Sequence, residues 1–148
     1  MKLNLDRYVP GLLLWLSNKM ASSASSLYRT HFDLGVDDWR VLSYFEIHSW
    51  STASSACDLM GLDKAAVSRS VALLQERGFL KSRPLGLRKI GYATTPAGRK
   101  QHDRIIRLAT AREEALLGGF SPQERDALIG YLNRMLANLD AVREVGKD

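Results

Sequence analysis

The side chains best suited to chemistry lie on one short segment, residues 63–78. Val67, Val71 and Leu74 recur at the three- and four-residue spacing of a helix, so they share one face. The opposite face carries small and polar residues, which are Lys64, Ala65, Ser68, Arg69 and Ala72. An arginine near the start of a helix can donate paired hydrogen bonds to guanine N7 and O6, and small neighbours let the backbone enter the major groove. The pattern predicts that Arg69 contacts a base.

The neighbouring polar residues fit a different role. Lys64, Ser68 and Thr52 are candidates for phosphate contacts, because amines, hydroxyls and helix N-termini hold a phosphate without reading base sequence. Arg69 also has a plainer interpretation, in which it pairs with Glu76 or with water on an exposed face.

Charge is concentrated in the middle of the 148-residue chain. The formal net charge is +5, with 21 Lys and Arg against 16 Asp and Glu. Residues 1–50 are neutral overall, residues 51–100 carry nine bases and three acids, and residues 101–148 carry seven bases and eight acids. Scattered solvated charge would not gather in one third, so this distribution favours a segment that binds a polyanion.

The elements around this segment follow from capping and turn residues. Thr52 is a good N-cap for a short helix that ends at Gly61, and Asp63 caps the next helix, which Gly78 ends. Cys57 is predicted to fill a small-residue slot where the two helices cross, as a buried and inert thiol rather than a redox sensor.

Residues 79–95 have the character of a small hairpin, with β-type residues around Pro84, Gly86 and Gly91. This segment contains four bases and no acid; the bases are Lys81, Arg83, Arg88 and Lys89. We expect Arg88 and Lys89 to contact the minor groove or the DNA backbone, and Arg83 to contact a phosphate at the base of a strand.

Longer helices are expected at both ends. Residues 9–30 have apolar side chains at helical spacing, and Asp37 or Asp38 can cap a helix that follows Gly35. Thr95 with Pro96 starts a fifth helix, and the Ser121 to Glu124 capping box starts a sixth, whose apolar pattern continues to Val142. The predicted class is mainly α with a small β-hairpin wing.

Two short helices joined by a glycine-containing turn and followed by a basic hairpin form a winged helix-turn-helix. The sequence resembles the MarR family of such regulators in four stretches: Trp39 to Leu42, Thr52 to Leu80 including Gly61 to Lys64 and Val67 to Arg69, the Glu76 to Leu80 exit, and Thr94 to Gly98. The family's wing usually carries an Asp before paired bases, whereas this chain has Leu87 before Arg88 and Lys89.

The resemblance implies one domain over residues 1–148. Residues 36–95 would form the DNA-binding part, and residues 8–31 and 96–146 would form a helical dimerisation part. It also implies a homodimer that binds double-stranded DNA at a pseudo-palindromic operator, most simply as a repressor, and a small aromatic or phenolic effector that releases it. The effector pocket is expected near the corner of the first two helices, with Trp15, Tyr28, His31 and Trp39 as candidates, although these aromatics also fit a dimer core.

Other classes of protein find less support in the sequence. The three histidines are far apart, and no phosphate loop, catalytic triad or metal-ligand spacing occurs, so we expect no catalytic residue, cofactor or metal. The apolar run after Lys2 and Arg7 is too short for an export signal, and no run of about 18 apolar residues occurs, which predicts a cytoplasmic protein without a membrane span. The remaining alternatives are an interaction module for an acidic protein partner and an enzyme that uses the dispersed histidines.

Overall fold

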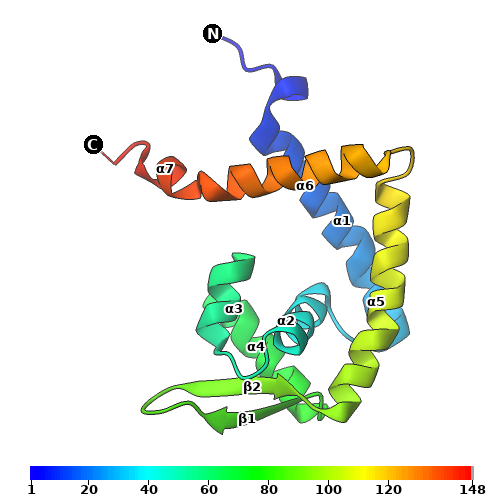
Figure 1. The fold of residues 1–148 in the computed structure, drawn as a ribbon, viewed down its shortest axis with the longest axis vertical. Coiled ribbons are helices and arrows are strands. Elements are labelled where there is room, and N and C mark those ends of the chain that lie inside the picture. The colour runs from blue at the N-terminus through cyan, green and yellow to red at the C-terminus, as the bar shows by residue number, and fades with distance from the viewer. Residues whose placement is uncertain (148) are drawn as a thin grey trace. The chain divides into compact units, whose positions relative to one another are not determined.

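The computed structural model describes residues 1–147 and is mainly helical, with one two-stranded antiparallel sheet (Figure 1). This confirms the predicted fold class. Two compact units divide the chain, one covering Met1–Arg107 and the other beginning at Leu108. The assignment of one domain to residues 1–148, with parts at 8–31, 36–95 and 96–146, stays a prediction, and its last residue, Asp148, lies outside the described residues.

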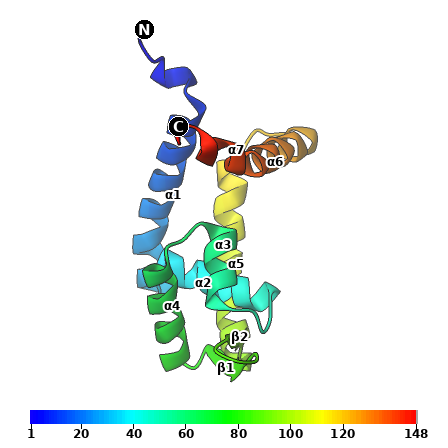
Figure 2. The ribbon, with the colours of Figure 1, turned by 90° about the vertical axis from the view of Figure 1, so that its left-hand side faces the viewer.

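The first unit contains the helix-turn-helix and the hairpin, which lie together in Figure 2. Its elements in chain order are the 3₁₀ helix η1 (Leu5–Arg7), α1 (Val9–Phe32), α2 (Val36–Ile47), α3 (Ala53–Met60), α4 (Lys64–Glu76), β1 (Leu80–Pro84), β2 (Ile90–Thr94) and the first turns of α5 (Pro96–Leu116). The strands pair from Leu80 with Thr94 to Pro84 with Ile90. No helix among residues 1–147 has the length and apolar character needed to cross a membrane.

The second unit contains the end of α5, then α6 (Pro122–Ala137) and α7 (Leu139–Glu144). The prediction of one continuous sixth helix as far as Val142 is wrong, because α6 ends at Ala137. The Asn138 amide donates to the carbonyls of Met135 and Leu136, so the regular i to i−4 ladder is interrupted there. Asparagine competes with the helical backbone for hydrogen bonds and therefore favours helix ends.

The core of the first unit lies where α2 packs on α4. Val41, Leu42 and Phe45 of α2 and Val67 and Leu74 of α4 are completely buried. Burying side chains of this size contributes about 1.5–3 kcal/mol each before conformational entropy is subtracted. The predicted inward face of α4 is therefore confirmed.

Three helix starts confirm the capping predictions. The Thr52 hydroxyl accepts from the Ser55 amide at 3.1 Å, and an Asp63 carboxylate oxygen accepts from the Ala66 amide at 2.7 Å. The Ser121 hydroxyl accepts from the Glu124 amide at 3.1 Å, and Glu124 accepts from the Ser121 amide at 2.9 Å. Each bond satisfies an amide that the helix itself leaves unpaired.

The start of α2 differs from the prediction, because neither Asp37 nor Asp38 is its N-cap. The helix begins at Val36 with Gly35 in the N-cap position, and Asp38 reaches back to accept from the Gly35 amide at 2.8 Å. Asp37 instead pairs with Arg40 at 3.3 Å. A carboxylate in the third helical position can accept a hydrogen bond from the N-cap amide and so stabilise the helix start without being the N-cap itself. The acidic pair therefore marks a helix that begins a few residues earlier than predicted.

Cys57 does not fill the small-residue slot of the helix crossing, so that prediction is wrong. Ala56 is the completely buried residue of α3, whereas Cys57 is half-buried and carries a free thiol. One residue along a helix rotates the side chain by about 100°, which moves the slot from Cys57 to its neighbour.

Candidate nucleic-acid interface

The exposed face of α4 contains every residue that the sequence predicted for it. Lys64, Ala65, Ser68, Arg69 and Ala72 are all exposed, while Val67, Val71 and Leu74 face the core. The Asp63 cap fixes the start of the helix, and the side chains on this face are accessible to solvent. Their contacts with DNA stay predictions.

Ser70 is a positioning residue that sequence reasoning missed. It is buried on the inner face of α4, and its hydroxyl donates to an Asp38 carboxylate oxygen at 2.7 Å. The same carboxylate caps α2, so one side chain ties the start of α2 to the middle of α4. A serine three residues after Val67, within the apolar stripe, was the signal available in the sequence.

A polar groove of about 490 Å³ lies beside this link. Residues of α1, of the start of α2 and of α4 line it, among them Arg29, Asp38 and Arg69. Among residues 1–147 no carboxylate pairs with Arg29 or Arg69. The groove therefore offers two unpaired guanidinium groups at the corner of the first two helices.

The wing brings three of the predicted residues together. Arg88, at φ 64°, and Lys89 lie in the exposed turn between the strands, which the Leu85 amide closes by donating to the Lys89 carbonyl at 2.9 Å. Thr52, Arg88 and Lys89 all line a groove of about 630 Å³ at the start of α3. Asp58 also lines this groove, but the two cations outnumber it, and together with the helix N-terminus they favour an anion there.

Arg83 lies apart from that groove, over the ring of Trp50. Its guanidinium carbon is 3.9 Å from the Trp50 ring centroid, and Lys81 Nζ is 5.6 Å from the same centroid. Trp50 falls in the connector between α2 and α3 and belongs to no periodic pattern, so nothing in the sequence alone marks it as functional.

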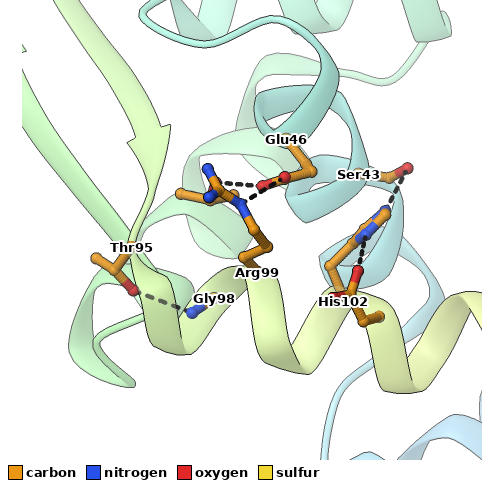
Figure 3. Close-up of polar contacts among 8 residues, drawn as sticks. Ser43, Glu46, Thr95, Gly98, Arg99 and His102 are labelled. Carbon is orange, nitrogen blue, oxygen red and sulfur yellow. Dashed lines mark hydrogen bonds and ion pairs between the residues drawn. The ribbon is translucent and has the colours of Figure 1, made fainter.

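The base of the wing is joined tightly to α5 (Figure 3). The Thr95 hydroxyl donates to the Gly78 carbonyl at 2.6 Å and accepts from the Gly98 amide at 3.0 Å. A Cβ at Gly98 would lie 2.0 Å from the Phe79 carbonyl oxygen, so only glycine allows this approach. The predicted Thr95 cap is confirmed, and it fixes the wing to the helix that follows.

A second set of polar contacts joins α2 to α5 and β2 (Figure 3). Glu46 accepts from Arg99 Nε at 2.9 Å and from the Thr94 hydroxyl, while His102 Nε2 lies 3.4 Å from Ser43 Oγ. Burial alone would raise the pKa of Glu46, but the hydrogen bonds from Thr94 and Arg99 outweigh it and lower the pKa below its ordinary value of 4.5.

Replacing Glu46 with Gln is expected to remove a pH-dependent part of the stability. A lowered pKa means that the ionised carboxylate stabilises the fold above pH 4.5 and that this contribution disappears as the pH falls through the lowered pKa. Urea unfolding should find Glu46→Gln about 1 kcal/mol less stable than the wild type at neutral pH, and nearly equal to it near pH 3. A difference that is the same at both pH values would show that charge is not the cause.

The four aromatic candidates for an effector pocket do not share one of the described grooves. Trp15 and His31 are exposed on α1, and Tyr28 is 4% exposed. Trp39 stacks on His102, with ring centroids 5.2 Å apart, and lines a small apolar groove between α2 and α3. Their role in binding an effector stays a prediction. No cluster of three metal-binding side chains occurs within residues 1–147.

No family model matches the sequence, and no curated protein matches it. Solved structures do. A MarR/EmrR family transcriptional regulator from Acinetobacter sp. ADP1 is 29% identical, with a TM-score of 0.86 over 94% of this chain and 99% of that chain. The MepR–DNA complex from S. aureus is 17% identical, with a TM-score of 0.75 over 90% of this chain and 98% of that one.

A third solved structure, Bordetella bronchiseptica BpsR, is 19% identical, with a TM-score of 0.74 over 93% of this chain and 99% of that one. The DNA binding of that protein is regulated by 6-hydroxynicotinic acid. Likenesses at 17% and 19% show the fold. The match at 29% spans nearly all of both chains, and the element order agrees with it, so this chain is similar over almost its whole length to winged helix-turn-helix transcriptional regulators of the MarR family and shares their fold.

Proposed function

We propose that this protein is a homodimeric repressor that binds a pseudo-palindromic operator in double-stranded DNA, in the cytoplasm. The exposed face of α4 is the main observation behind this proposal. It presents cations and small side chains to solvent, while a hydrogen bond from the buried face ties α4 to α2. The solved MepR complex, which holds DNA on the same fold, supports it. Arg69 would contact a base, with Ala65 and Ala72 leaving room for the groove, while Lys64, Ser68 and Thr52 would contact phosphates.

The wing would add further phosphate contacts. Arg88 and Lys89 are exposed at its tip, and the segment from Phe79 to Thr95 contains no acid that could neutralise them. With about three to five phosphates contacted per protomer, the logarithm of affinity should fall with the logarithm of salt concentration at a slope of roughly −5 to −9.

Dimerisation is supported by large apolar side chains that each unit leaves exposed. In the first unit they lie on α1 and include Leu12, Leu14 and Leu16, and in the second they include Ile129 and Leu136 of α6. Exposed apolar patches of this kind mark interaction surfaces. The two α4 helices of a dimer, which we call the recognition helices, would meet successive major grooves on one side of the duplex if they lay about 34 Å apart. A dimer would therefore supply both the spacing and the affinity.

Selection of bound sequences from a random duplex library tests the proposal. The expected result is an enriched inverted repeat, bound by a species of twice the 16.5 kDa chain mass, with the salt dependence given above. A stable monomer, or the absence of an enriched sequence, would contradict it. No duplex binding even at low salt would favour the alternative, an interaction module for an acidic protein partner.

We also propose that a small aromatic or phenolic effector releases the protein from DNA. The BpsR structure supports a small molecule as regulator in this fold, and the polar groove that contains Arg29 and Arg69 touches α1, α2 and α4 together. A ligand there would alter the recognition helix directly. A coupling of about 1–3 kcal/mol would change operator affinity about 5- to 150-fold. Titration of phenolic acids against the operator complex tests this, and an unchanged affinity would contradict it.

A further inference from the structure

Trp50 combines an unusual backbone with an unusual position. Its φ is 60°, a left-handed value that bulky side chains rarely adopt. Two hydrogen bonds to β2 hold it there: the Trp50 amide donates to the Tyr92 carbonyl at 2.7 Å, and the Tyr92 amide donates to the Ser51 carbonyl at 2.9 Å. A tryptophan kept in such a conformation, in a connector that has no place in the core, invites a functional explanation.

Two cations of the wing lie over the ring of Trp50. Lys81 and Arg83 are two residues apart on β1, so their side chains project from the same face of the sheet. Arg83 lies over the ring at 3.9 Å and Lys81 at 5.6 Å from its centroid. Lys81 and Arg83 are both exposed, so their charged groups can be reached from solvent on this face.

No carboxylate within residues 1–147 forms an ion pair with Lys81 or Arg83. Stacking occupies the flat face of a guanidinium and leaves its N–H groups in the plane free to donate. Two like charges on one strand face repel each other, and an aromatic ring offsets that repulsion only in part. A polyanion would complete the arrangement, because phosphate oxygens accept from both cations.

We propose that Trp50 is a positioning residue that holds Arg83, with Lys81 beside it, against a phosphate of the DNA backbone. The inference rests on the proposed DNA-binding function. It adds a phosphate-binding surface made of Trp50, Lys81 and Arg83, separate from the groove formed by Thr52, Arg88 and Lys89. Because this surface meets phosphates, it raises affinity for every sequence and leaves the choice of bases to α4.

Substitutions at Trp50 can separate the ring from the backbone. Asparagine tolerates a left-handed φ better than most residues, so Trp50→Asn removes the ring while keeping the turn. Trp50→Phe keeps a smaller ring and should restore most of the affinity. Circular dichroism and thermal unfolding of each variant check that the fold persists, and Lys147→Ala serves as a control for losing one cation far along the chain from the wing.

The test is a double-mutant cycle on the full chain, with the selected operator duplex as probe. Arg83→Ala should weaken binding about 3- to 10-fold and make the salt slope shallower by about 2 in the dimer, from one phosphate per protomer. Trp50→Asn should weaken binding by a similar factor, and should have no further effect once Arg83 is alanine. Relative affinities for operator variants should stay unchanged.

Three results would overturn the proposal. One is full affinity in folded Trp50→Asn, and another is a loss that is the same with and without Arg83, because the ring would then act independently of that side chain. The third is a wild-type chain that binds no duplex, which would refute the proposed function itself and this inference with it. Binding by the wild type together with additive variants would refute the positioning role alone.

Discussion

Arg69→Ala is expected to abolish recognition of the operator while leaving the protein folded. The side chain is exposed on α4, and no residue within 1–147 forms an ion pair with it, so its removal costs little stability. A paired contact to guanine contributes about 1–3 kcal/mol of discrimination per half-site. Over two half-sites, the affinity for the selected operator should therefore fall by about 30-fold or more.

The gel-shift comparison needs both specific and random duplexes. Arg69→Ala should bind random duplex almost as well as the wild type does, because phosphate contacts dominate that binding. Lys64→Ala is the matched variant, since it removes an exposed cation from the same helix and should weaken binding to both duplexes alike. An Arg69→Ala protein that still prefers its operator by the wild-type factor would show that the arginine reads no base.

Gly98→Ala is expected to destabilise the first unit strongly and to displace the wing. The added Cβ would lie 2.0 Å from the Phe79 carbonyl oxygen and 2.9 Å from the Phe79 carbonyl carbon, and both are backbone atoms that no rotamer change can move. Overpacking of this kind costs typically about 1–3 kcal/mol. Each kcal/mol lowers Tm by about 2–4 °C in a chain of this size, so thermal unfolding should shift by several degrees.

Gly130→Ala is the control for helix propensity. Gly130 lies inside α6, and nothing stands within 4 Å of a Cβ added there. Alanine should therefore stabilise that helix by about 0.5–1 kcal/mol, the opposite sign to the effect at Gly98.

Operator binding by Gly98→Ala should weaken as well, because Gly98 and Thr95 fix the base of the wing. Equal stability of Gly98→Ala and the wild type would contradict the close approach.

The sequence by itself determined the elements that local rules govern. Thr52, Asp63 and Ser121 marked helix starts, because a side chain bonds to an amide only three residues away. The apolar spacing of Val67, Val71 and Leu74 determined which face of α4 is buried. These signals depend on neighbours in the chain, so no tertiary information was needed to read them, and the resemblance of the motifs then indicated the family.

Only the tertiary structure decided which distant residues meet. Ser70 donates a hydrogen bond to Asp38, which is 32 residues away in the sequence, and Arg83 stacks on Trp50. Neither contact produces a periodic pattern in the sequence. In α3 the buried small residue is Ala56 and not Cys57. Neighbouring residues of a helix are rotated by about 100°, so an error of one residue in the prediction exchanges a buried side chain for a more exposed one. Local bonding fixes where a helix begins, whereas the packing of whole surfaces fixes what each side chain touches.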